Sequence, residues 1–262
     1  MKHLAYILTA VLAWGTVPGA RAADWQSLPA SASEIKHMVA SLPMPDAAPS
    51  ERGRRLICVD PGHPNSYNSA TNTINGTNEN HINWAVALKL RSILQEKGFE
   101  VAMTKNAELQ SVENKERALI CNNSGAALAV HLHCETTPGS GFALYYPDRE
   151  GTFNYNNDPD IGFKGPTAQV IAGSQLLAQA VQTGMRAKLA GSLNDLGIKG
   201  DSHTQVGASQ GALTFSIFSQ IPTLTIEMVV LTDKHDAAFI KSEAGQQKMA
   251  QAIASGIALA AQ

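Results

Sequence analysis

Four side chains of this 262-residue chain stand at positions where their chemistry needs an explanation: His63, Glu79, His133 and Glu227. Two neutral imidazoles and one carboxylate, with one coordination position left open, are the ligand set of a catalytic zinc hydrolase. The remaining glutamate would then be available to move protons. The sequence contains no HExxH motif, which excludes the arrangement in which both histidines lie on one helix.

The positions of His63 and Glu79 relative to apolar patterns favour ligand roles. His63 directly follows a short apolar strand predicted at 56–59, at the sheet edge where ligands collect in α/β proteins. A solvated loop imidazole is the alternative. Glu79 lies three residues before Ile82, on the apolar stripe of a helix predicted over about 78–97. A glutamate in a first turn ordinarily serves the helix cap or dipole, but on the inward face it needs a partner, and a metal or a cation is the least costly one.

Two histidines share one face of a predicted strand end. In the segment from Ala129 onward, His131 and His133 point to one side, and Val130 and Leu132 to the other. His133 is nearer the carboxyl end of the strand and is therefore the candidate ligand. His131 would support it or lie in the core. Either histidine taken alone could also be satisfied by the backbone or by solvent.

Glu227 interrupts an otherwise apolar strand predicted at 223–230. A carboxylate in such a strand is costly unless it is paired or does chemistry. Because desolvation raises the pKa of a carboxyl group, Glu227 suits a general base that works near neutral pH.

The elements that must position these residues follow an alternating pattern from residue 54 onward. Apolar runs predict strands at 56–59, 99–103, 126–133, 141–146, 213–218 and 223–230, and helical periodicity predicts helices at 78–97, 109–123, 169–189 and 237–260. Polar loops at 64–78, 147–166 and 191–211 would surround the edge that carries the candidate site. Alternation of this kind predicts one α/β domain with a largely parallel sheet.

The amino-terminal part of the chain is typical of an exported protein. Residues 1–22 combine a short polar start, an apolar run at 4–14 and the small residues of a cleavage site at 20–22. The alternative, a membrane anchor, is disfavoured because this run is too short to cross about 30 Å of hydrocarbon. Residues 23–53 are rich in proline, alanine and serine and are predicted to be a tail and linker, which leaves 54–262 as the catalytic domain.

Charge and cysteine content limit the possible functions. Loss of Lys2 and Arg21 with the signal leaves 18 basic and 22 acidic side chains, a net charge of −4, which argues against nucleic-acid binding. The cysteines, Cys58, Cys121 and Cys134, have no CxxC spacing, so a cysteine-held metal is not expected. One disulfide with one free thiol and three free thiols both remain open.

A series of short motifs follows in a fixed order. They are Ile57-Cys58-Val59-Asp60-Pro61-Gly62-His63, Glu79 at a helix start, Glu116-Arg117 with Asn122, Val130-His131-Leu132-His133, Gly141-Phe142, Ser174 to Val181, and Ile221-Pro222 to Glu227. Over about residues 55–260 this order resembles the zinc-dependent N-acetylmuramoyl-L-alanine amidases of the type-3 amidase family. The resemblance implies a three-layer α/β/α sandwich with a central mixed, mostly parallel sheet.

The resemblance also implies an activity and a set of roles. His63, Glu79 and His133 would bind one zinc ion per chain, and Glu227 would be the catalytic glutamate. The expected protein is a periplasmic or extracellular enzyme that acts on peptidoglycan and has no transmembrane segment after signal cleavage. Two alternatives remain: a zinc carboxypeptidase on the stem peptide, for which Arg117 is no clear carboxylate-binding group, and a non-catalytic wall-binding or regulatory protein.

The motifs depart from the family pattern at two places. Pro64 follows the first histidine where the family commonly has glycine. The segment His131-Leu132-His133-Cys134-Glu135 stands where the family usually has serine, an aliphatic residue, histidine, a small residue and asparagine. The candidate ligand His133 is kept, but its neighbours differ.

Overall fold

The structure is a computed structural model that describes residues 55–155 and 162–261. The predicted signal, residues 1–22, and the predicted tail and linker, residues 23–53, lie outside the described residues.

A mixed sheet forms the centre of the described domain. Its six strands run in the order β2-β1-β3-β8-β4-β7 in the described part of the chain. These are β1 (Leu56–Pro61), β2 (Glu100–Met103), β3 (Leu128–Glu135), β4 (Phe142–Tyr146), β7 (Asp195–Gly200) and β8 (Thr223–Val230). The first four in that order are parallel, whereas β4 pairs with β8 in the antiparallel direction and β7 is parallel to β4. The predicted mostly parallel sheet is confirmed.

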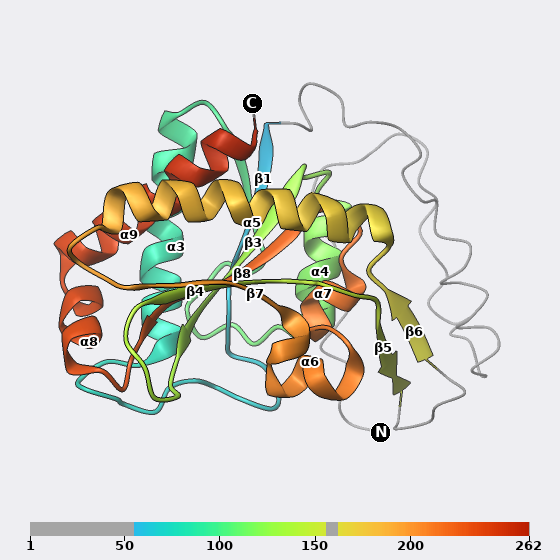
Figure 1. Cartoon of the computed structure of the whole chain (residues 1–262), viewed down its shortest axis with the longest axis horizontal. Helices are drawn as coiled ribbons and strands as arrows, with labels where there is room; N and C mark the ends of the chain where they lie inside the picture. The colour runs from blue at the N-terminus through green and yellow to red at the C-terminus, as the bar shows by residue number, and fades with distance from the viewer. Residues whose placement is uncertain (1–54, 156–161, 262) are drawn as a thin grey trace. The chain divides into compact units, whose positions relative to one another are not determined.

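Helices cover both faces of this sheet (Figure 1). One face packs against α3 (Glu79–Glu96), α5 (Ala168–Leu189) and α9 (Glu243–Ala260), and the other against α4 (Asn114–Asn123) and α7 (Thr214–Phe218). Alternation along β1 separates the two layers, because Ile57 and Val59 join the first core and Cys58 joins the second. The predicted three-layer arrangement is therefore confirmed. Within the described ranges, no helix has both the length and the apolar character to cross a membrane.

The predicted strand at 213–218 is wrong, because these residues form the helix α7. The apolar side chains of Phe215 and Phe218 are one helical turn apart, and both are buried in the second core with the small residues of α4. A short apolar run does not distinguish a buried strand from a buried helix, and here the packing against α4 decides.

Two segments predicted as loops contain regular structure. The segment 191–211 holds β7 and the short helix α6 (Gln205–Gln210), and 147–166 holds the pair β5 (Gly151–Asn154) and β6 (Gly162–Gly165). Glycines make these elements difficult to predict from the sequence. Gly197 within β7, for example, has a φ of 89° that few other residues adopt. The strands therefore lack the alternation by which a strand is recognised in sequence.

Helix caps explain where predicted helices begin and end differently. The predicted closing helix at 237–260 is divided into α8 (Lys234–Lys241) and α9, because Ser242 accepts a hydrogen bond from Gly245 N and caps α9. The predicted helix at 109–123 begins only at Asn114, where Glu113 and Glu116 form a capping box.

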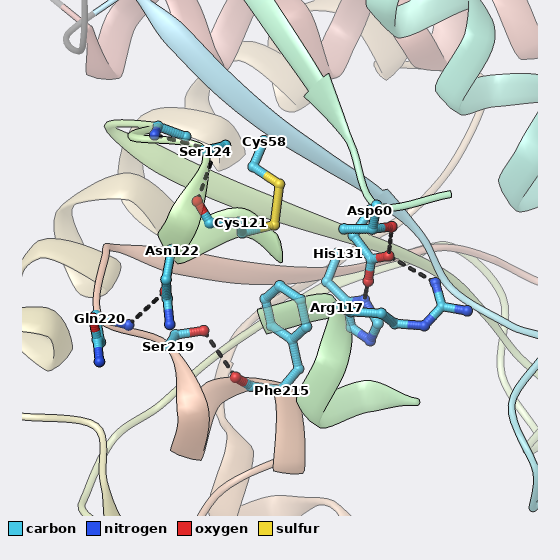
Figure 2. The surroundings of a disulfide bond; sticks show 12 residues. Cys58, Asp60, Arg117, Cys121, Asn122, Ser124, His131, Phe215, Ser219 and Gln220 are labelled. Carbon is cyan, nitrogen blue, oxygen red and sulfur yellow. Dashed lines mark hydrogen bonds and ion pairs between the residues drawn. A yellow bond between two sulfur atoms is a disulfide. The ribbon is translucent and has the colours of Figure 1, made fainter. Parts of the chain in front are cut away.

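A disulfide joins the sheet to the second helical layer. Cys58 in β1 is bonded to Cys121 in α4, 63 residues away, whereas Cys134 is a free and buried thiol (Figure 2). Of the two possibilities open from the sequence, the structure shows one disulfide and one thiol.

We expect this disulfide to contribute to stability by restricting the unfolded chain. Replacing both Cys58 and Cys121 by alanine should lower the free energy of unfolding by about 2–4 kcal/mol, measured by urea denaturation. Cys134→Ala is the matched control, and it should keep the response to a reducing agent that the double variant lacks. Equal stability of the wild-type protein with and without reductant would contradict this assignment.

Candidate metal and catalytic site

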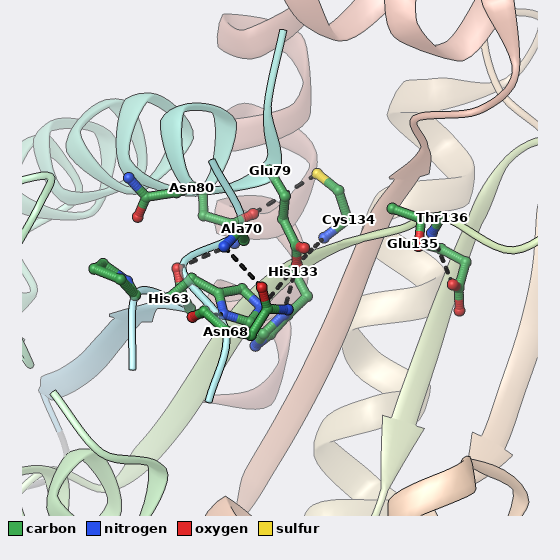
Figure 3. A network of polar contacts seen from close by, with 12 residues as sticks. His63, Asn68, Ala70, Glu79, Asn80, His133, Cys134, Glu135 and Thr136 are labelled. Carbon is green, nitrogen blue, oxygen red and sulfur yellow. Dashed lines mark hydrogen bonds and ion pairs between the residues drawn. The ribbon is translucent and has the colours of Figure 1, made fainter. Parts of the chain in front are cut away.

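Three predicted ligands meet at the edge of the sheet where β1 and β3 end. One side-chain atom from each of His63, Glu79 and His133 lies within 4.8 Å of the others. Glu79 Oε1 is 2.8 Å from His133 Nδ1 and 3.4 Å from His63 Nε2, and the three side chains point toward one another (Figure 3). Two imidazole nitrogens and a carboxylate oxygen are thus gathered from two strand ends and one helix start.

Glu79 does not serve as the cap of its helix. The cap of α3 is Asn78, whose side chain accepts a hydrogen bond from His81 N. Glu79 instead accepts a hydrogen bond from the backbone N–H of Cys134 over 3.2 Å, and its Oε1 also contacts the ring nitrogen Nδ1 of His133. Burial alone would raise the pKa of Glu79, but its contacts with the His133 and His63 rings outweigh the effect of burial and hold this pKa well below its usual range. The capping alternative is therefore wrong for this residue.

His63 is a buried residue with an unusual backbone. Its φ of 60° lies in the left-handed region that side chains other than glycine seldom adopt. Lys105 Nζ donates to the carbonyl oxygen of His63, and the ring Nδ1 lies 3.2 Å from the carbonyl oxygen of Asn68. Because Nδ1–H donates to that carbonyl, the lone pair is left on Nε2, which faces Glu79. A solvated loop imidazole is not what the structure shows.

Gly62 allows the first strand end to approach the second. A Cβ atom at this position would lie 2.3 Å from His133 Nε2 and 2.7 Å from the carbonyl oxygen of Leu132. Gly62 N also donates to that carbonyl oxygen over 2.9 Å. Any larger residue here would displace His133 or separate the two strands.

His131 lies behind His133 and is not one of the three candidate ligands, His63, Glu79 and His133. Its Nε2 is 2.7 Å from His133 Nε2, its Nδ1 is bonded to Asp60 Oδ2, and its ring is stacked on Phe215. The face shared by the two histidines is therefore as predicted, and both rings have protein partners. Burial, together with the nearby His131, lowers the pKa of His133 to about 4, so its ring is neutral at pH 7, as a metal ligand must be.

Two buried charged residues, Asp60 and Lys105, support this edge, and neither was predicted from the sequence to have a role. Asp60 is fully buried and accepts hydrogen bonds from Thr104, His131 and Arg117, the last over 2.7 Å. Burial would raise the pKa of Asp60, but Arg117 and His131 hold it well below its usual range. Lys105 is also buried, and this burial lowers its pKa to about 8. The available signal was a charged residue within two positions of the end of a predicted apolar strand in both cases.

Glu227 lies beside His133 on the neighbouring strand. The two residues are register partners in the parallel pair of β3 and β8, which places both side chains on the same face. Its Oε2 is buried and has no hydrogen-bond partner within the described residues. Burial, with the charges of Glu79 and Glu135, raises the pKa of Glu227 well above its usual value.

A small pocket of about 80 Å³ opens next to Glu227. Its lining includes Tyr145, Lys199 and Glu135 as well as Glu227. The Lys199 ammonium lies 5.6 Å from the centre of the Tyr145 ring. Glu135 accepts hydrogen bonds from the backbone of Thr136 and turns away from the ligand group (Figure 3). Glu227 therefore has solvent-connected space on one side.

A second group of possible ligands, Asp233, His235 and Asp236, serves a structural role. Asp233 caps α8, and the buried Asp236 accepts hydrogen bonds from Ser140 Oγ and from the backbone of Gly141 and Val230. Its carboxylate oxygens are thus occupied within the fold.

Comparison with known proteins places this chain in a family. A sequence model described as N-acetylmuramoyl-L-alanine amidase matches residues 57–259. The N-acetylmuramoyl-L-alanine amidase AmiA of Escherichia coli K12 is 25% identical over 226 residues, which cover 78% of this chain and 75% of that protein. An N-acetylmuramoyl-L-alanine amidase of Mycobacterium tuberculosis is 25% identical over 237 residues, 81% of this chain and 88% of that protein.

A solved structure shares the fold. The crystal structure of the N-acetylmuramyl-L-alanine amidase Ami1 from Mycobacterium smegmatis superposes with a TM-score of 0.63 at 20% sequence identity, and the match covers 81% of this chain and 99% of that one. At this identity the likeness shows the fold alone.

The raised pKa of Glu227 has a measurable consequence for stability in chelator-treated protein. Between the ordinary value of 4.5 and the raised pKa, the folded state holds a proton that the unfolded state has lost, so stability falls with rising pH, by about 1.4 kcal/mol per pH unit. Glu227→Gln lacks this loss and should be more stable than wild type at pH 8, with the difference vanishing toward pH 4. Glu150→Gln, at an exposed glutamate, is the control. A difference that does not depend on pH would contradict the raised pKa.

Proposed function

The chain belongs to the N-acetylmuramoyl-L-alanine amidase family, and we propose that it uses one zinc ion held by His63, Glu79 and His133, with Glu227 as the general base. As a member of this family it is an enzyme that hydrolyses the amide bond between N-acetylmuramic acid and L-alanine. The observation that carries this proposal is the convergence of these three ligand atoms beside an unpartnered, buried carboxylate oxygen.

The donor set fits zinc. Two imidazole nitrogens and one carboxylate oxygen suit zinc better than calcium or magnesium, which prefer oxygen ligands. The proton on His63 Nδ1 is held by the carbonyl of Asn68, and the lowered pKa of His133 keeps its ring neutral. Three protein ligands leave a position for water or substrate, as in catalytic zinc sites.

In the proposed reaction, the protein's own side chains transfer the proton. When bound, zinc would polarise the scissile carbonyl group and lower the pKa of water to about 7. Glu227 takes the proton of the attacking water and returns it to the nitrogen of the leaving L-alanine. Its raised pKa suits this exchange, because a carboxylate with a higher pKa is a stronger base toward the proton of water.

The structure weakens the carboxypeptidase alternative. Such an enzyme needs a cation to bind the free carboxylate of its substrate, and Arg117 was the residue considered for this role. Arg117 is fully buried, and its N–H groups already bond Asp60 and the backbone. A non-catalytic wall-binding role is disfavoured because the three candidate ligands and the candidate base lie at the same edge of the sheet.

The site of action follows from the substrate. Peptidoglycan lies outside the cytoplasm, so we propose that the protein is exported to the periplasm or beyond the cell, with residues 1–22 as its signal.

Mass analysis of the products tests the reaction. Zinc-loaded mature protein should hold about one zinc per chain and release stem peptides with a free amino-terminal L-alanine from purified peptidoglycan. A chelator should abolish this release reversibly, and His133→Ala should bind no zinc. Stem peptides shortened at their carboxyl ends would indicate the carboxypeptidase, and unchanged peptidoglycan would indicate a binding protein.

Substitution of Glu227 separates a base from a ligand. Glu227→Gln keeps the shape of the side chain but cannot accept a proton, so turnover should fall by about 100- to 10,000-fold. Its zinc content should match wild type, whereas Glu79→Gln should also bind zinc more weakly. A metal-free Glu227→Gln protein would show that Glu227 is a ligand, and an unchanged rate would show that another group is the base.

A further inference from the structure

We propose that His131 is a positioning residue that selects the tautomer of His133, by accepting a hydrogen bond from His133 Nε2–H and so leaving the Nδ1 lone pair turned toward Glu79 and His63. The inference rests on the proposed zinc site. It concerns the position at which this chain has histidine and the type-3 amidases usually have serine.

The first step concerns Asp60, the buried carboxylate that contacts His131. Asp60 is fully buried, and one of its oxygens is 2.7 Å from Arg117 Nη1 (Figure 2). Its other oxygen faces His131 Nδ1. Because an ionised carboxylate can only accept hydrogen bonds, the proton of the His131 ring must stand on Nδ1.

The second step is the orientation of the His131 ring. The ring is 4% exposed and stacked on Phe215, with centroids 4.6 Å apart and an interplanar angle of 6°. It cannot turn without breaking both this stack and the bond to Asp60. With the proton on Nδ1, the Nε2 atom of a neutral ring is an acceptor, and it lies 2.7 Å from His133 Nε2.

The third step is that His133 has two competing acceptors. Its Nδ1 lies 2.8 Å from Glu79 Oε1, and a proton on Nδ1 would satisfy that contact while blocking the nitrogen that faces the site. The His131 acceptor on the opposite side stabilises the tautomer with the proton on Nε2. The chain Arg117, Asp60, His131 and His133 thus sets which nitrogen is available, as carboxylate partners do for metal-binding histidines generally.

Zinc affinity of matched variants tests the role. His131→Leu removes the acceptor and should weaken zinc binding about 10- to 100-fold in competition with a chromophoric chelator. His131→Gln can supply an acceptor oxygen and should recover most of this loss. Thr225→Val is the control, since Thr225 is the register partner of His131 on β8 and its hydroxyl has no hydrogen-bond partner among the described residues.

A measurement on the unaltered protein does not depend on whether a variant folds. In zinc-loaded, isotope-labelled wild-type protein, proton–nitrogen correlation spectra should show His133 bound to metal through Nδ1 with its proton on Nε2. A proton on Nδ1 would overturn the inference, as would wild-type zinc affinity in a folded His131→Leu variant. Failure of the wild-type protein to bind zinc at all would instead refute the proposed function.

Discussion

The ion pair between Asp60 and Arg117 lies beneath the candidate site, with both side chains completely buried. Moving two charges out of water costs several kcal/mol for each, and their attraction offsets this only when their remaining hydrogen-bonding groups also have partners. Arg117 meets this condition by donating to three carbonyl oxygens, those of Pro61, Pro64 and Val112. Loss of either partner would leave an uncompensated charge in the interior, so the strand end, the following loop and α4 are held in one arrangement.

The positions of both candidate histidine ligands, His63 and His133, depend on this arrangement. Asp60 orients His131, which lies behind His133. Arg117 holds the backbone on either side of His63, whose own carbonyl is bound by Lys105. The disulfide between β1 and α4 fastens the same two elements, since its cysteines lie on the strand of Asp60 and the helix of Arg117. The candidate ligands are therefore preorganised by a network of buried polar groups that have hydrogen-bond partners.

Glu227, unlike Asp60 and Arg117, lacks hydrogen-bond partners among the described residues for part of its buried side chain. It lies on β8 beside His133, but one of its oxygens is buried with no hydrogen-bond partner in the described part of the chain, and its pKa is raised. A carboxyl group with full hydrogen bonding would stay ionised and exchange protons poorly near neutral pH. This sheet edge thus combines candidate metal ligands in fixed positions with a carboxyl group of raised pKa, and the proposed metal-assisted hydrolysis would use both.

Local patterns in the sequence indicated His63, Glu79, His133 and Glu227 as candidate site residues, because periods of 2 and 3.6 residues predict which side chains of a strand or helix point inward. They also identified most of the sheet and the two-sided helical cover. Tertiary structure decided what these patterns cannot encode: the register that sets His133 beside Glu227, the disulfide across 63 residues, and the role of Asp60 as a partner of three distant side chains. The mistaken strand at 213–218 has the same origin. A short apolar run buries its side chains equally well as helix or strand, and only contacts distant in sequence choose between them.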